Sequence, residues 1–293
     1  MKKILLTTTA LVATAGMAAA EINLGGSARF GLVYNDSAAT ETQLHNRFTL
    51  NIDGSTETDA GVSLFARVRV RGGNTGDGAT SASGVSAPRV GMSTGGMTLA
   101  VGNINGALES MPGLYGGAVG LTGVGWGNVI ANANPDGAWM WDSFSSAGGG
   151  SNGAELIYSM GDFGLHVSHS PVSERTAAHI SYNFGDWTAA VAVQEGDAAG
   201  EDMTVVTLGG SLGDVNVGLS FADFETGDAA QINGSFSLAG GTTVTVYATS
   251  SDMSDDAYGL GFTHSLGGAT LAGGISNTYA GATVADLGVR FGF

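Results

Sequence analysis

Five arginines at odd-numbered positions are the most conspicuous chemical groups of this sequence. In extended backbone, side chains two residues apart project on the same side, so the three arginines that follow each other at every second position lie in one row. Such a row is either a basic surface that acts on passing ions or a structural ladder of hydrogen-bonded side chains. The five are Arg29, Arg47, Arg67, Arg69 and Arg71.

A second set of chemical groups lies in one long segment, residues 105–153, that lacks any regular pattern. Connections of this length are uncommon in compact domains and are usually functional. The bulky aromatic residues of the segment either pack it against neighbouring structure or present an apolar surface to a specific substrate. The segment holds the acids Glu109, Asp136 and Asp142, many glycines, and the aromatic residues Trp126, Trp139, Trp141 and Phe144.

The remaining reactive side chains form no recognisable catalytic or metal site. The five histidines lie on different expected strands without the spacing of zinc ligands, and no serine stands in a nucleophile motif with a partnered histidine and acid. Asp252, Asp255 and Asp256 offer carboxylate oxygens that could hold Ca²⁺, although most acidic loops are simply solvated. We therefore expect no required cofactor and leave calcium at the acidic loops as an alternative.

The segments that must position the arginines read as short strands. Apolar and polar residues alternate, as between Ile22 and Tyr34, and glycine, aspartate, asparagine or serine bounds each segment. We count sixteen such segments, joined by tight glycine turns and by longer acidic links at residues 195–202, 222–229 and 250–256. An even number suits a closed antiparallel barrel, which leaves no unpaired edge in lipid.

The two ends of the chain carry export and insertion signals. Met1 to Ala20 combine a charged start, a short apolar core and an A-x-A ending, which predicts a secretory signal peptide over residues 1–20 that is cleaved before Glu21. The last strand alternates apolar residues and ends in Phe291 and Phe293. This ending is similar to the signal that the barrel-assembly machinery of the outer membrane reads, so we expect one transmembrane barrel over residues 21–293.

The charge balance of the mature chain excludes one class of partner. Removal of the signal peptide removes Lys2 and Lys3, the only lysines, and leaves eight arginines against 26 acidic residues, a net charge of −18. Binding of nucleic acid needs clustered positive charge, so we expect no such partner. The chain has no cysteine, so disulfides and thiolate metal sites are excluded as well.

Several short segments resemble the general diffusion porins of Rhodobacter-type alphaproteobacteria. They are EINL at 21–24, ARFG at 28–31, GSTETDAGV at 54–62, VGN at 101–103 and VADLGVRFGF at 284–293. The resemblance implies a 16-stranded outer-membrane β-barrel that assembles as a homotrimer. It also implies that residues 105–153 form a constriction loop folded inward. The sequence departs from the family pattern here, because this loop has fewer acids and more glycine and tryptophan than a general porin is expected to have.

These observations predict a water-filled channel for passive diffusion of ions and small hydrophilic solutes. Arginines on the lipid face of a barrel would cost ~2–4 kcal/mol each near the bilayer centre, so we place all five on the inner face. Our hypothesis is that they form a basic wall opposite Glu109, Asp136 and Asp142, which creates a transverse field. The expected surroundings are outer-membrane lipid and lipopolysaccharide. The alternatives are a substrate-specific channel, an outer-membrane barrel enzyme and a secreted acidic β-sandwich adhesin.

Overall fold

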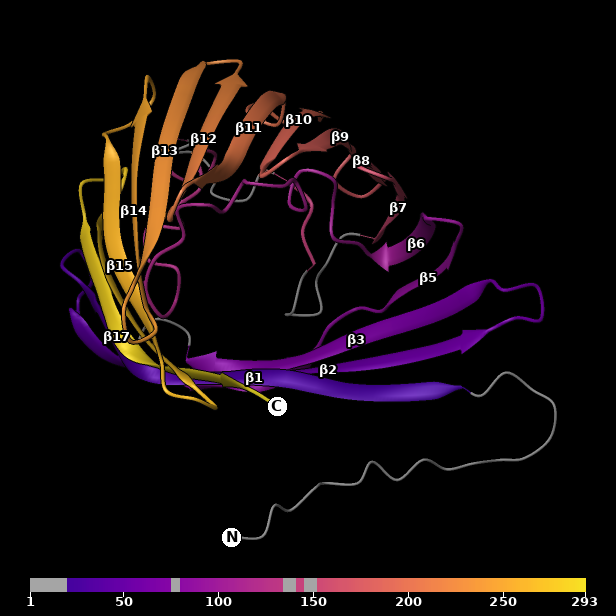
Figure 1. The fold of residues 1–293 in the computed structure, drawn as a ribbon, viewed down its shortest axis with the longest axis horizontal. Helices are drawn as coiled ribbons and strands as arrows, with labels where there is room; N and C mark the ends of the chain where they lie inside the picture. Colours follow the sequence, from indigo (N-terminus) through magenta and orange to yellow (C-terminus); the bar gives the residue numbers. More distant parts are fainter. Residues whose placement is uncertain (1–19, 75–79, 134–140, 145–151) are drawn as a thin grey trace, which may run out of the picture.

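The chain folds into one closed ring of antiparallel strands. The computed structural model describes residues 20–74, 80–133, 141–144 and 152–293, so the expected signal peptide lies, but for its last residue, outside the described residues. Strands that follow one another in the chain pair with each other, except that β4 and β5 both pair with β3, and β1 pairs with β17 to close the ring (Figure 1). The strands are β1 (Glu21–Asn35), β2 (Thr42–Glu57), β3 (Ser63–Asn74), β4 (Thr80–Val85), β5 (Arg89–Thr94), β6 (Met97–Asn103), β7 (Asn152–Met160), β8 (Phe163–Ser170), β9 (Arg175–Phe184), β10 (Trp187–Glu195), β11 (Met203–Leu212), β12 (Val215–Phe224), β13 (Gly227–Leu238), β14 (Thr242–Ser251), β15 (Ala257–Ser265), β16 (Thr270–Asn277) and β17 (Thr283–Gly292).

The prediction of a 16-stranded barrel is confirmed, although the ring contains one more strand segment than expected. The additional segment is β4, and β4 and β5 share one position because both pair with β3. β5 pairs with residues 63–67 of β3, and β4 pairs with residues 70–74. Residues 80–85 are small and polar and lack the alternation that identified the other strands, so the sequence pattern missed them.

The outside of the ring is apolar along its whole circumference. Large apolar side chains of alternate strand residues are exposed, among them Ile22 at 75% and Leu44 at 74%. In a water-soluble fold these side chains would be buried in a core, whereas hydrocarbon is a suitable solvent for them. No helix in the described part of the chain is long and apolar enough to span a membrane.

The C-terminal phenylalanine closes the barrel. The backbone of Phe293 exchanges two hydrogen bonds with Gly26 of β1, at 2.9 and 3.1 Å. Its ring stacks on Phe48 of β2, with ring centres 5.7 Å apart. A side chain at Gly26 would collide with this ring, so the closure requires glycine at that position.

Most turns follow the sequence prediction. A glycine with positive φ occurs in the tight turns expected at Gly95 and Gly96, Gly161, Gly185, Gly213, Gly240 and Gly241, and Gly267. The expected long link at residues 222–229 is wrong, because β12 continues to Phe224 and β13 starts at Gly227. The polar residues there are strand residues that extend the hairpin rather than a loop.

The main hydrophobic core lies inside the ring. We call the connection between β6 and β7 the inner loop; its described parts are residues 104–133 and 141–144. Its apolar residues, such as Leu114 and Ile130, pack on small and apolar residues of β9 to β13. Figure 1 shows this magenta trace inside the ring along the strands that lie across from β1, β2 and β3.

Candidate functional site

The five arginines of the sequence analysis lie on three adjacent strands, β1, β2 and β3. We call these five residues the basic wall. Two of them contact the inner loop, which places them on the inside of the ring. Arg29 Nη1 donates to the carbonyl oxygen of Leu121 at 3.2 Å, and the guanidinium of Arg69 lies 4.5 Å from the ring centre of Phe144. The inner loop therefore reaches the basic wall at two points.

The three arginines of β3 are each held by the residue directly opposite on β2. Side chains that face each other across an antiparallel pair are close enough to bond. The bonds are Arg67 to Asp53 at 2.5 and 3.1 Å, Arg69 to Asn51 at 3.0 Å, and Arg71 to Thr49 at 3.2 Å. The row is thus a hydrogen-bonded ladder and a basic surface at once, since each bonding guanidinium keeps its charge.

Polar side chains of the strands hold the inner loop against the inside of the barrel. Backbone groups of a buried loop need hydrogen-bond partners, and here the strand side chains supply many of them. The bonds run around the ring from β8 to β17. They join Ser168 and His179 to Ala107, Thr207 to Pro112, Gln231 to Gly127, Tyr247 to Gly125, and Asp286 to Leu121.

The tip of the inner loop, residues 118–124, is fixed most tightly. The buried carboxylate of Asp286 accepts hydrogen bonds from Leu121 N at 2.8 Å, Thr122 N at 2.6 Å and Thr122 Oγ1 at 2.7 Å. The side chain of Leu121 occupies a notch formed by Gly31 and Gly288, which face each other across β1 and β17. A side chain at either glycine would displace Leu121, so the notch is specific for this loop tip.

The acids expected to face the basic wall make their bonds elsewhere. Glu109 accepts hydrogen bonds from Tyr115, a residue of the same loop, and from Trp141 Nε1 at 2.6 Å. Burial raises the pKa of Glu109 above its ordinary value, against the opposing effect of these two bonds. Its carboxylate therefore holds the inner loop together.

Asp142, a residue of the inner loop, lies beside the first residue of β9, Arg175. It accepts a hydrogen bond from Ser173 Oγ at 3.1 Å and lies 3.8 Å from Arg175 Nη1. Burial raises its pKa, and the bond from Ser173 is the largest effect in the other direction. Asp136 lies outside the described residues, so the structure brings the five arginines together but joins neither described acid to them.

A buried polar cluster joins β5, β7 and β8. Glu155 accepts a hydrogen bond from Arg89 Nε at 2.5 Å and is bonded to His166 Nε2 at 2.9 Å. His166 packs edge-on against His179, whose Nδ1 bonds to the inner loop at Ala107. No spacing in the sequence indicates that these residues meet, because they lie on four different strands.

Three functional residues were missed in the sequence analysis. Arg290 and Asp286 lie on the inner face of β17, where the alternation of the C-terminal strand already placed them. His45 accepts a hydrogen bond from Arg29 Nε through its Nε2 at 2.9 Å. An accepting Nε2 requires a neutral ring with the proton on Nδ1. No sequence signal connects Asp286 to the loop, because its partners lie about 165 residues away.

Metal binding finds little support in the described residues. They contain no group of three or more histidine, aspartate or glutamate side chains placed to hold an ion. The acids Asp252, Asp255 and Asp256 therefore offer no formed calcium site in this part of the chain.

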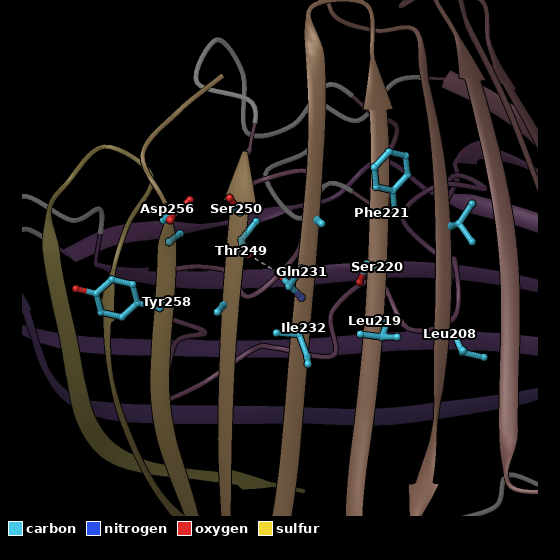
Figure 2. Close-up of a pocket in the computed structure, with 14 residues that line it drawn as sticks. Leu208, Leu219, Ser220, Phe221, Gln231, Ile232, Thr249, Ser250, Asp256 and Tyr258 are labelled. Atoms are coloured by element: carbon cyan, nitrogen blue, oxygen red, sulfur yellow. Dashed lines mark hydrogen bonds between the residues drawn. The ribbon is translucent and has the colours of Figure 1, made fainter. Parts of the chain in front are cut away.

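A hollow of 540 Å³ lies on the outside of the barrel. Figure 2 shows side chains from β11 to β15 around it, with Leu219, Phe221, Ile232 and Tyr258 among those labelled. These four are exposed and belong to the apolar outer face. The hollow is an irregularity of that face, where Ala230 and Ala248 are smaller than their neighbours.

Comparisons with known proteins agree on one family. The model of the family described as Gram-negative porin matches residues 7–287. A curated porin of Fuscovulum blasticum is 29% identical over 299 residues, which cover 93% of this chain and 100% of that protein. Two solved variants of the Rhodopseudomonas blastica porin have similar structures, with TM-scores of 0.80 and 0.81 and sequence identities of 27% and 26%. Each match covers 93% of this chain and 100% of the porin chain.

Proposed function

Because the chain belongs to the Gram-negative porins and is a general-diffusion channel of the outer membrane, we propose that its ion preference is set between the basic wall and the inner loop. Ions and small hydrophilic solutes pass through this constriction. The observation that carries the proposal is the position of the inner loop, inside a closed barrel and in contact with Arg29 and Arg69.

The charges on the two sides of the constriction are unequal. The basic wall contributes five guanidiniums, of which Arg67 is paired with a carboxylate, Asp53. On the loop, Glu109 is bonded to Tyr115 and Trp141, and Asp142 lies beside Arg175. We infer that the described part of the constriction has a positive potential, which favours anions and orients water across the passage.

Neutralising two wall arginines tests this proposal. The variant R67Q/R69Q is expected to shift the permeability ratio toward cations by about threefold per charge, the factor that Coulomb's law gives for charges ~6 Å apart in water. The reversal potential across a salt gradient in planar bilayers measures it, at low ionic strength because salt screens the effect. A variant D186N, which changes one charge in a short turn, serves as control. A reversal potential equal to that of the wild type contradicts the proposal.

The mature protein, its oligomer and its surroundings belong to the same proposal. We propose that residues 1–20 are removed as a signal peptide, that residues 21–293 form a single barrel, and that three copies associate among outer-membrane lipid and lipopolysaccharide. The backbone pairing of Phe293 with Gly26 supports a role for Phe291 and Phe293 in insertion by the barrel-assembly machinery. The relatives of the chain are channels, and we attribute no catalysis to it.

Gel mobility tests the trimer. The purified protein is expected to run as an SDS-resistant trimer without heating and as a monomer beginning at Glu21 after boiling, because closed barrels leave no edge for detergent to open. Mass spectrometry of the boiled chain determines the N-terminus. An unheated sample that runs as a folded monomer would argue against the trimer and leave the barrel itself unaffected.

A further inference from the structure

We propose that Arg29, Arg47 and Arg290 form a binding site for a small oxyanion, with inorganic phosphate as its simplest ligand. The inference deepens the proposed function and rests on it, since the ligand reaches the site through the channel. It concerns three arginines at one level of the barrel and adds Arg290 to the basic wall. We call these three residues the arginine triad.

Strand register places the triad side by side. Arg29 on β1 lies directly opposite Arg47 on β2 and directly opposite Arg290 on β17. Directly opposite residues have Cβ atoms about 5 Å apart, and like charges in that position repel each other. Three guanidiniums in such a row are destabilising unless an anion lies between them.

One carboxylate, Asp286, lies near enough to Arg29 to attract it, but the described residues provide no carboxylate that bonds to any of the three arginines. Arg47 and Arg290 make no side-chain hydrogen bond or ion pair in the part of the chain that the structure describes. Within the same described residues, Arg29 donates to two uncharged groups, the His45 ring and the carbonyl oxygen of Leu121. Asp286, on the same face of β17, directs both carboxylate oxygens to the loop tip. The triad therefore differs from the β3 row, where each arginine is bonded to its partner on β2.

A hollow beside the triad has room for a ligand. A space of 390 Å³ is lined by all three arginines together with Leu121 and the hydroxyl residues Ser27 and Thr270. A second space of 210 Å³, also lined by Arg29 and Arg290, lies against the glycine-rich loop tip. The hydroxyl groups add donors to the arginine forks, and the fixed loop tip gives the site a wall.

The geometry of guanidinium groups selects the ligand class. The planar fork of arginine binds carboxylate or phosphate through two parallel hydrogen bonds, and these charge-assisted bonds are about twice as strong as neutral ones. A monocarboxylate occupies one fork, whereas a tetrahedral dianion offers oxygens to two or three forks at once. We therefore expect phosphate and sulfate to bind more tightly than acetate, and chloride most weakly.

Block of chloride current by phosphate tests the site. In planar bilayers, phosphate is expected to reduce the chloride current of the wild-type channel at constant ionic strength. The half-blocking concentration is expected to rise about tenfold for R290Q and more for R47Q/R290Q, since each replacement removes a charge-assisted bond. The control is D186N, which changes one charge in the short turn between β9 and β10 and should leave the half-blocking concentration within about twofold.

A binding measurement separates failure of the site from failure of the channel. Phosphate should raise the melting temperature of the folded barrel in detergent, because a ligand that binds only the folded state stabilises it, and R47Q/R290Q should lose this increase. If phosphate still raises the melting temperature of R47Q/R290Q, the proposed site is overturned, whether or not the channel conducts. Loss of the increase together with an inactive wild-type channel supports the site and overturns the proposed function. R47K/R290K keeps the charge without the fork and should bind phosphate more weakly than the wild type.

Discussion

Replacing Asp286 with alanine is expected to make the channel current several-fold noisier and to introduce brief partial closures. The carboxylate accepts three hydrogen bonds from the loop tip. Bonds to a charged group contribute about 1.5–3 kcal/mol each, so the tip loses roughly 3 kcal/mol or more even if they are not additive. Leu121 in its glycine notch and the bond from Arg29 remain, and the tip then exchanges between the wall and the lumen.

Single-channel recording measures the current noise, and two further variants show whether the noise depends on the hydrogen bonds that Asp286 accepts. D286N keeps one acceptor oxygen in nearly the same shape and should produce an intermediate noise level. D214N removes an equal charge in the turn between β11 and β12, away from the side chains that bond to the inner loop, and should behave as the wild type does. A quiet current of unchanged amplitude from D286A would mean that the other contacts alone hold the tip.

Replacing Glu155 with glutamine is expected to cost the barrel about 3–5 kcal/mol of stability, because it leaves the charge of Arg89 buried without its partner. The side chains of Arg89 and Glu155 are 13% and 0% exposed. The pair Arg67–Asp53 has the same shortest distance, 2.5 Å, but its side chains are 41% and 33% exposed. Exposed pairs contribute about 0–1 kcal/mol, so D53N is the matched control.

Urea unfolding of the purified barrel in detergent compares the two variants. The midpoint should fall strongly for E155Q and little for D53N. A double variant R89M/E155L, which replaces both charges by apolar side chains, should recover much of the loss, because it removes the unpaired charge instead of creating one. Equal losses for E155Q and D53N would show that burial does not decide the contribution of these pairs.

The barrel was predictable because its determinants are local. Outside β4, apolar and polar residues alternate with a period of two along the strands, so Leu44 and Phe48 identify the outer face of β2 without knowledge of any other strand. Gly161, Gly185 and Gly213 likewise mark their turns through their own backbone conformation. β4 escaped prediction because residues 80–85 carry no alternation, and its place depends on pairing with β3.

The inner loop and its bonds were not predictable, because they depend on which strands the ring brings together. The sequence indicated that residues 105–153 are functional and that Glu109 and Asp142 are charged. It could not show that Glu109 bonds to Trp141, or that Asp142 lies beside Arg175. Each of these contacts depends on the path of the inner loop along the inside of the barrel. That path is determined by bonding partners such as Asp286, which are far away in sequence.

The attachment of the loop tip also constrains the order of assembly. The backbone of Leu121 is held by Arg29 on β1, the first strand of the chain, and by Asp286 on β17, the last strand to be synthesised. The notch for its side chain exists only when Gly31 and Gly288 have paired. Since contacts between distant parts of a chain form late, docking of the tip must follow ring closure. The passage thus acquires its final width in the last step of folding, after the wall around it is complete.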